Sequence, residues 1–162
     1  MNLGEMRTRV RRELKDEDAA SYRWSDSELD RHIARAVAEL SLAVPLESKA
    51  ALTTTSGSRE LSVSGLASLV AVEAVEYPTG QYPPSYVMFS LWGNMLTLLV
   101  DNAPGGGEGV AVFYGKLHTL DATTSTLPPS VEELVAAGAA GYAALEWANY
   151  AVNRVNTGGE AV

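Results

Sequence analysis

The feature that most constrains this chain is a helix start at Trp24–Leu29, which reads Trp-Ser-Asp-Ser-Glu-Leu. Ser25 is a favourable N-cap residue, because its hydroxyl can accept a hydrogen bond from a backbone N–H of the first helical turn. Glu28 follows three residues later and can accept from the backbone N–H of the cap, which completes a capping box. Asp26 and Glu28 also place negative charge at the positive end of the helix dipole. The sequence therefore predicts that a helix begins here.

Behind this cap, apolar residues recur at the spacing of one helical face as far as Pro45, which ends the pattern. The opposite face carries charged side chains, among them Arg31, Arg35 and Glu39. The apolar face consists of Leu29, Ile33, Ala36, Val37, Leu40 and Val44. An amphipathic helix buries its apolar face, so we expect the preceding segment to pack against it and the later chain to return over it.

Size and composition limit the classes of protein that this chain can be. It has 162 residues, of which 46% are hydrophobic, so it can bury a real core as one domain with an inserted lobe. It has no cysteine, which excludes a disulfide framework and a thiolate zinc site. Residues 1–15 are basic without an apolar run, unlike a signal peptide, and the apolar stretch Leu134–Leu145 is too short to span a membrane. We therefore expect a soluble protein made in a cytoplasm.

The charge distribution singles out the N-terminal segment. The net charge of −8 argues against an ordinary nucleic-acid-binding protein, yet residues 1–50 contain nine of the twelve Lys and Arg. Asn2 can cap a first helix over residues 3–14, along which Arg7, Arg11 and Lys15 lie four residues apart on one flank. Two interpretations remain open: a solvated face beside the core, or a basic flank that meets an acidic partner surface or phosphate.

From about residue 51 the pattern changes to short β-rich runs separated by turn residues. Gly93 and Asn94 join two of these runs and suit the positive φ of a tight hairpin. The runs cover residues 59–63, 69–77, 86–91, 95–100 and 110–114. Short strands at this spacing are typical of an antiparallel β-sandwich or small barrel. We therefore predict an α+β fold, in which residues 1–50 and 119–162 form a helical bundle domain and residues 51–118 form an inserted β lobe.

A further helix is predicted over residues 131–155, where Ser130 and Glu133 have the spacing of a second capping box. One face reads Leu134, Ala137, Gly138, Gly141, Leu145, Ala148 and Val152. The rest of the circumference is also poor in charge, which is typical of a helix buried on more than one side. Either it is the central helix of a compact monomer, or it packs against another subunit. In the second case the predicted interface residues are Gly138, Gly141, Tyr142 and Trp147.

The sequence contains no recognisable catalytic or metal-binding pattern. The two histidines, His32 and His118, lie in different predicted elements, and Glu28 lies one helical turn before His32. We therefore expect a structural contact between His32 and Glu28. The glycine run at residues 105–109 precedes a strand rather than a helix, unlike a phosphate-binding loop. We expect no catalytic residue, no metal site and no cofactor, and hence no enzyme.

The order of these elements resembles a known family. A basic first helix, the Trp-Ser-Asp-Ser-Glu-Leu-Asp start of the second helix and a late alanine-rich helix are similar to the head–tail connector proteins of long-tailed double-stranded DNA phages. These are also called adaptor or head-completion proteins. The resemblance is best over residues 3–44 and 127–155. The inserted β lobe departs from the simplest members of the family, which leaves its role open.

The resemblance implies a structural virion protein of the phage neck, made in the host bacterial cytoplasm. Copies are expected to form a dodecameric ring between the portal protein and a tail-side neck or tail terminator protein. The ring would extend the DNA channel, and double-stranded DNA would pass through it without specific binding. An acidic wall suits this role, because affinity for phosphates grows with each Lys or Arg contact. No membrane is involved.

The resemblance further implies that the end of the last helix docks onto the portal. Tyr150 and Val155 offer apolar anchors there, and Arg154 is the only base after Lys116. An alternative from another class is a standalone module whose β lobe binds a protein or glycan ligand. Co-purifying proteins discriminate between the two, since a portal and a major capsid protein would indicate the connector.

Overall fold

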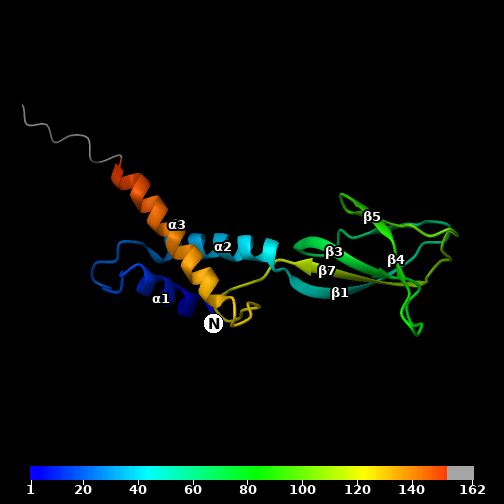
Figure 1. The fold of residues 1–162 in the computed structure, drawn as a ribbon, viewed down its shortest axis with the longest axis horizontal. Coiled ribbons are helices and arrows are strands. Elements are labelled where there is room, and N and C mark those ends of the chain that lie inside the picture. The colour runs from blue at the N-terminus through cyan, green and yellow to red at the C-terminus, as the bar shows by residue number, and fades with distance from the viewer. Residues whose placement is uncertain (153–162) are drawn as a thin grey trace, which may run out of the picture. The chain divides into compact units, whose positions relative to one another are not determined.

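The computed structural model describes residues 1–152, and its chain divides into two compact units (Figure 1). The helical unit consists of Met1–Ala43 and the described residues from His118 onward, and the β unit consists of Val44–Leu117. The predicted α+β fold class is confirmed, since helices form one unit and strands the other. None of the helices in the described part of the chain has both the length and the apolar character needed to cross a membrane.

The helical unit contains α1 (Leu3–Glu13), α2 (Asp26–Ala43) and α3 (Glu132–Val152). At the start of α1, Asn2 Oδ1 accepts from the Glu5 backbone N–H at 3.0 Å, and the Asn2 N–H donates to the Glu5 carboxylate at 2.8 Å. At the start of α2, the Ser25 N–H donates to the Glu28 carboxylate at 2.7 Å, and the Glu28 N–H donates to Ser25 Oγ at 3.3 Å. The capping box predicted at Ser25 is therefore confirmed.

One hydrophobic cluster holds the three helices together. Most of the apolar face predicted for α2 lies in this cluster, where Leu29 and Ile33 are almost completely buried. Val44, the last predicted member, does not belong to it, because α2 ends at Ala43 and Val44 is 47% exposed in the β unit. Trp24, from the segment before α2, is buried with them. The fully or nearly fully buried members are Met6, Val10, Trp24, Leu29, Ile33, Ala36, Val37, Leu127, Val135, Ala136, Ala139 and Ala143. The later chain does return over α2, as its amphipathic pattern predicts.

The β unit contains two antiparallel sheets. The four-stranded sheet has the order β1-β7-β3-β4, and the three-stranded sheet has the order β2-β6-β5. The strands are β1 (Leu46–Thr53), β2 (Glu60–Ser62), β3 (Leu69–Glu76), β4 (Tyr86–Val87), β5 (Phe89–Trp92), β6 (Met95–Leu98) and β7 (Gly109–Lys116). Trp92 pairs with Met95 across the predicted two-residue turn, in which Gly93 has a φ of +55°. The predicted hairpin is thereby confirmed.

Both sheets contribute side chains to a second hydrophobic cluster. Val75 and Val112 come from the four-stranded sheet, and Leu61, Leu96 and Leu98 come from the three-stranded sheet. The two sheets therefore share a core in the manner of a sandwich, one of the two predicted arrangements. Neither sheet closes into a barrel within residues 44–117, all of which the structure describes.

Strand β1 is not among the predicted runs. Its sequence, Leu-Glu-Ser-Lys-Ala-Ala-Leu-Thr, is rich in residues that favour helices and poor in β-branched residues. It is nevertheless a regular strand, because it pairs with β7 at eight consecutive positions from Leu46 opposite Lys116 to Thr53 opposite Gly109. Pairing with a distant part of the chain overrides the local preference here.

Candidate functional site

Helix α3 has two apolar faces with different surroundings. One face points into the core of the helical unit, where α3 packs against α1 and α2. It consists of the buried residues Val135, Ala136, Ala139 and Ala143. At 100° per residue, these four side chains lie on one side of the helix, so the opposite side of α3 does not contact the core of the helical unit.

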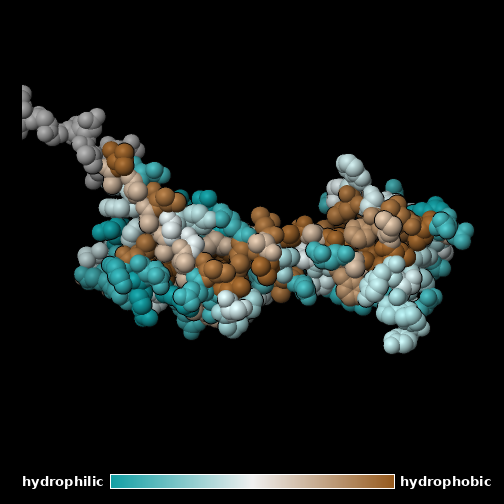
Figure 2. Space-filling model, viewed as in Figure 1, coloured by the Kyte–Doolittle hydropathy of each residue, from teal (hydrophilic) through white to brown (hydrophobic). Residues whose placement is uncertain are grey.

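The opposite side of α3 is apolar and open, and we call it the α3 stripe. It consists of Leu134, Ala137, Gly141, Leu145, Ala148 and Val152, all of them exposed. Leu134 and Leu145 are each 63% exposed, and Val152 is 73% exposed. A Cβ added to Gly141 would meet no atom within 4 Å. In Figure 2, hydrophobic residues reach the surface along α3. A contiguous exposed apolar face of this kind is typical of a protein–protein interface.

The four predicted interface residues do not share one environment. Gly141 lies on the α3 stripe, whereas a Cβ at Gly138 would lie 3.5 Å from Ala36 Cβ on α2. Tyr142 is half-buried against α2, and Trp147 packs on Trp24 with their ring centroids 6.1 Å apart. The structure therefore places Gly138, Tyr142 and Trp147 in contacts within the same chain.

Tyr142 connects α3 to two charged residues of α2. The Arg35 guanidinium carbon lies 4.0 Å from the centroid of the Tyr142 ring, and the Tyr142 hydroxyl donates to the Glu39 carboxylate. This hydrogen bond, with help from Arg35, lowers the pKa of Glu39 below its ordinary value. The arrangement explains why an aromatic residue stands at this position without invoking a second subunit.

An aromatic cluster lies near the last turns of α3. Trp147 contacts Trp24 and also Tyr150, with 5.4 Å between the ring centroids of Trp147 and Tyr150. The Arg23 guanidinium carbon lies 4.8 Å from the Trp147 ring centroid. A groove of about 270 Å³ lies here, lined by Arg23, Trp24, Glu28, Glu146, Trp147 and Tyr150. Of the three predicted portal-docking residues, Tyr150 lies at this groove, and Arg154 and Val155 lie outside the described residues.

Glu146 is the electrostatic link between α3 and α2. Arg31 Nη2 lies 2.6 Å from Glu146 Oε2, and this hydrogen bond is the main reason why the pKa of Glu146 is lowered. His32 Nε2 also lies 2.6 Å from Glu146 Oε2, although without the alignment of a hydrogen bond. The partner of His32 is therefore Glu146 rather than the predicted Glu28, because α3 crosses α2 at this point.

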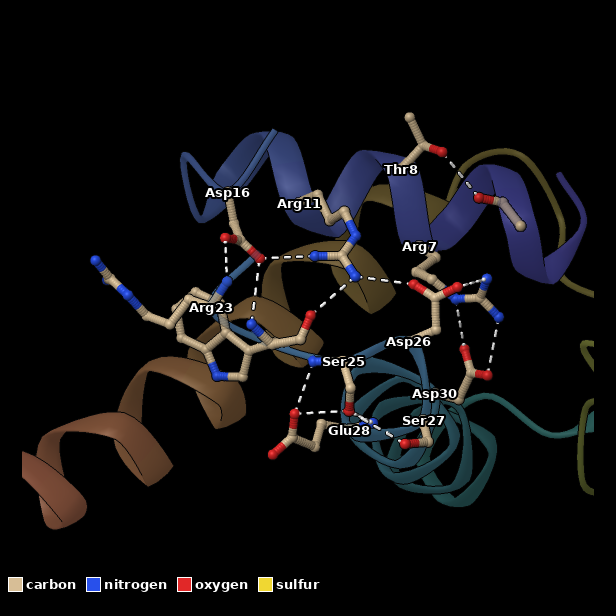
Figure 3. Close-up of polar contacts among 12 residues, drawn as sticks. Arg7, Thr8, Arg11, Asp16, Arg23, Ser25, Asp26, Ser27, Glu28 and Asp30 are labelled. Atoms are coloured by element: carbon tan, nitrogen blue, oxygen red, sulfur yellow. Dashed lines mark hydrogen bonds and ion pairs between the residues drawn. The ribbon is translucent and has the colours of Figure 1, made fainter. Parts of the chain in front are cut away.

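Two of the three residues of the predicted basic flank, Arg7 and Arg11, turn toward α2 (Figure 3). Arg7 donates to both carboxylate oxygens of Asp30 from Nε and Nη2, each at 2.9 Å, and to Asp26 from Nη1 at 2.9 Å. The hydrogen bond to Asp30 raises the pKa of Arg7 further above its ordinary value. Arg7 therefore holds α1 against the first turns of α2 and does not extend freely into solvent.

Arg11 is buried at the centre of the same network. Its guanidinium donates to Asp16 at 2.7 Å, to Asp26 at 2.8 Å and to the Trp24 carbonyl oxygen at 2.9 Å (Figure 3). Its hydrogen bond lowers the pKa of Asp26. Lys15, the third member of the predicted flank, lies just beyond α1 with a φ of +56°. Internal ion pairs thus engage Arg7 and Arg11, so these three residues do not form a free basic surface.

The remaining titratable candidates have local roles. His118 is buried, and its Nδ1 lies 3.0 Å from the Thr126 carbonyl oxygen. The Asp121 carboxylate accepts hydrogen bonds from the backbone N–H groups of Thr123 and Thr124, each at 2.7 Å, which lower its pKa strongly. Among the described residues, no group of three His, Asp or Glu side chains is arranged to hold a metal ion.

Comparison with known proteins identifies the family to which the chain belongs. The sequence profile of the SU10 adaptor protein family matches residues 1–161, nearly the entire chain. The chain belongs to the SU10 adaptor protein family. The resemblance to phage adaptor proteins is thereby confirmed. Among solved structures, a chain from the neck of an empty GTA particle computed with C6 symmetry is similar, with 16% sequence identity and a TM-score of 0.38. That similarity covers 100% of this chain and 82% of the other. No curated protein matches the chain.

In this SU10 adaptor, sequence reasoning missed how α3 divides into a packed and an open face. Leu134 and Val135 are neighbours of similar hydropathy, yet one is exposed and the other is buried. The one sequence signal that could have helped is Glu146, the only charged residue of α3 beyond its first turn. A lone carboxylate in an apolar helix predicts a basic partner on the helix that it faces, which is Arg31.

Proposed function

We propose that this adaptor is a structural component of a phage neck and that its copies associate through the α3 stripe into a ring. Family membership supports the neck location and a non-catalytic role in the virion. The single observation that carries self-association is the stripe, in which large aliphatic side chains are more than half exposed along one helix face. A contiguous exposed apolar face marks a surface at which another protein binds.

The energetic case for association is simple. Complete burial of a Leu or Val side chain contributes about 1.5–3 kcal/mol of free energy. Leu134, Leu145 and Val152 are mostly exposed in the protomer, so association would supply most of this free energy for each of them. Ala137, Gly141 and Ala148 lie between them, so a neighbouring helix can approach the backbone closely. The stripe therefore combines apolar anchors with a close-packing surface.

In the proposed assembly the ring is a dodecamer and lies between the portal protein and a tail-side neck or tail terminator protein. It extends the DNA channel, and the net charge of −8 disfavours phosphate contacts, so double-stranded DNA slides through without specific binding. Tyr150 contributes to portal docking together with Arg154 and Val155, which follow the described end of α3.

The test uses Gly141→Leu, which adds bulk on the stripe at a position where an added Cβ meets no atom within 4 Å. The protomer is expected to fold, because leucine favours a helix more than glycine does. We expect particles produced with this variant to lack the adaptor or to lack tails. The matched control is Gly65→Leu in the β unit, where an added Cβ also meets nothing within 4 Å. Mass spectrometry and electron microscopy of purified particles give the readout. Normal incorporation of the Gly141 variant would show that the stripe is not the subunit interface.

A further inference from the structure

Strand β1 is the long free edge of the β unit. It pairs with β7 at eight consecutive positions without a register shift, and no strand pairs with its other side within residues 1–152. The edge on the far side of this sheet is β4, which has only two residues. A long, regular and unpaired strand edge is a template for another strand, and proteins usually protect such edges.

The ladder shows which backbone groups of β1 are unpaired. Beyond its end, the Thr54 N–H donates to the Glu108 carbonyl oxygen at 2.9 Å, whereas the carbonyl of Gly109 turns away from β1 and accepts from the Thr79 N–H at 3.0 Å. Thr54 therefore directs its N–H toward β7, and the neighbouring residue, Thr53, directs its backbone groups to the other side. Because these directions alternate along a strand, the N–H and C=O groups of Lys49, Ala51 and Thr53 all point to the free edge of β1.

Lys49 is the only basic residue of β1, and a lysine commonly protects an edge strand, but its side chain points away from the free edge. The Lys49 ammonium lies 4.7 Å from the centroid of the Phe113 ring on β7 and 3.7 Å from the Glu76 carboxylate on β3. Both partners lie on the paired side of β1, so the lysine covers the sheet face and not the edge. Glu47, the other charged residue of β1, forms no ion pair with any residue in the described part of the chain.

A groove of about 400 Å³ lies between the edges of β1 and β2. Strand β2 is also an edge strand, and Leu61 is its inward apolar residue. The groove is lined by Ala51, Leu52, Thr53, Thr55, Glu60, Leu61 and Ser62. It therefore offers the unpaired backbone groups of β1 beside Leu52, which is half-buried, whereas Leu61 is 5% exposed and belongs to the core beneath. Unpaired backbone groups next to an apolar side chain are what an extended peptide recognises.

We propose that the β1 edge binds an extended strand of another neck protein, which adds to the four-stranded sheet and lies in the groove toward β2. Every second side chain of this strand is apolar and faces Leu52, and on the opposite face a basic residue lies beside Glu47. A second copy of this β unit fits poorly, because Val44–Leu117 contains six acids and three bases and would meet a surface of its own sign. This inference rests on the proposed neck location but not on the α3 stripe.

The experiment compares hydrogen exchange of the full-length protein alone with that of the protein in purified particles. We expect the Lys49, Ala51 and Thr53 amides to exchange about tenfold or more slowly in particles, because each gains a backbone hydrogen bond. Peptides from β7, whose amides are already hydrogen-bonded within the sheet, provide a protected reference within the same chain.

Two variants at one position add a functional readout. Ala51→Pro removes an N–H that β7 does not use, which an edge strand tolerates, and Ala51→Thr keeps that N–H. We expect the proline variant to fold and to give fewer tailed particles, with the threonine variant unaffected. Unchanged exchange at β1 while the protein is present in particles would overturn the inference, as would protection of β1 in the purified protein alone, which indicates a second copy. Absence of the protein from particles would instead overturn the proposed function, and the inference with it.

Discussion

Replacing the buried Arg11 with leucine is expected to destabilise the helical unit far more than replacing Arg12, an exposed charged residue of α1. Arg11 is 5% exposed, and its guanidinium donates to Asp16, to Asp26 and to the Trp24 carbonyl oxygen. Leucine fills part of the volume but provides no donor. Asp16 is itself buried, so the substitution leaves a carboxylate in the interior without its cation.

The magnitude follows from what remains around Asp16. Removing one partner of a buried ion pair costs about 3–5 kcal/mol, since the surviving charge stays desolvated. Asp16 keeps the hydrogen bond from the Arg23 N–H at 2.7 Å, and Asp26 is exposed enough for water to replace its partner. We therefore expect a value near the lower limit, about 3 kcal/mol.

Chemical denaturation followed by tryptophan fluorescence measures this loss. Trp24 is buried in the helical unit, whereas Trp92 of the β unit is largely exposed before unfolding, so the change in emission reports mainly on the helical unit. The matched control is Arg12→Leu, whose side chain is 67% exposed and lies 3.5 Å from Glu17. A surface pair of this kind contributes about 0–1 kcal/mol.

A double-variant cycle separates the ion pair from packing. Asp16→Asn removes the buried charge and keeps an oxygen that can accept from the Arg23 N–H. In the Arg11→Leu background it should therefore restore part of the stability, with a coupling of about 1–3 kcal/mol. If Arg11→Leu costs no more than Arg12→Leu, or if Asp16→Asn restores nothing, the network does not stabilise the fold as argued.

Two further predictions concern local hydrogen bonds. Ser25→Ala should lower the stability of the helical unit by about 1 kcal/mol, because the Glu28 N–H loses its cap; thermal melting that shows no loss would mean that α2 does not depend on this box. The lowered pKa of Asp121 means that its carboxylate adds stability above about pH 4, the ordinary range of Asp, and that this stability is lost as pH falls toward the folded-state pKa. Wild-type protein should therefore lose stability relative to Asp121→Asn between neutral pH and about pH 3 in urea titrations, and parallel curves would contradict the assignment.

Features that depend on neighbours in the chain could be predicted from the sequence. The capping box at Ser25 uses groups three residues apart, so its geometry follows once a helix begins there. The Gly93 hairpin is equally local, because a two-residue turn needs only residues that accept its dihedral angles. The apolar face of α2 was predictable for the same reason, since a period of 3.6 residues places Leu29 and Ile33 on one side.

Features that depend on distant partners were decided by the tertiary structure alone. The spacing of Arg7 and Arg11 indicates a flank, but whether that flank meets water or acids depends on where α2 crosses α1. The identity of His32's partner depends likewise on the crossing of α2 and α3.

The division of α3 is the clearest case, and it bears directly on function. Sequence alone determined that this helix is apolar around nearly its whole circumference, because hydropathy is a property of each residue. Which side of α3 becomes buried depends on where α1 and α2 pack against it. They pack against the side that carries Val135 and Ala139. Leu134 and Leu145 stay exposed because residues 1–152 contain no further helix that covers them. The interface candidate is therefore the apolar surface that remains after the chain has packed against itself.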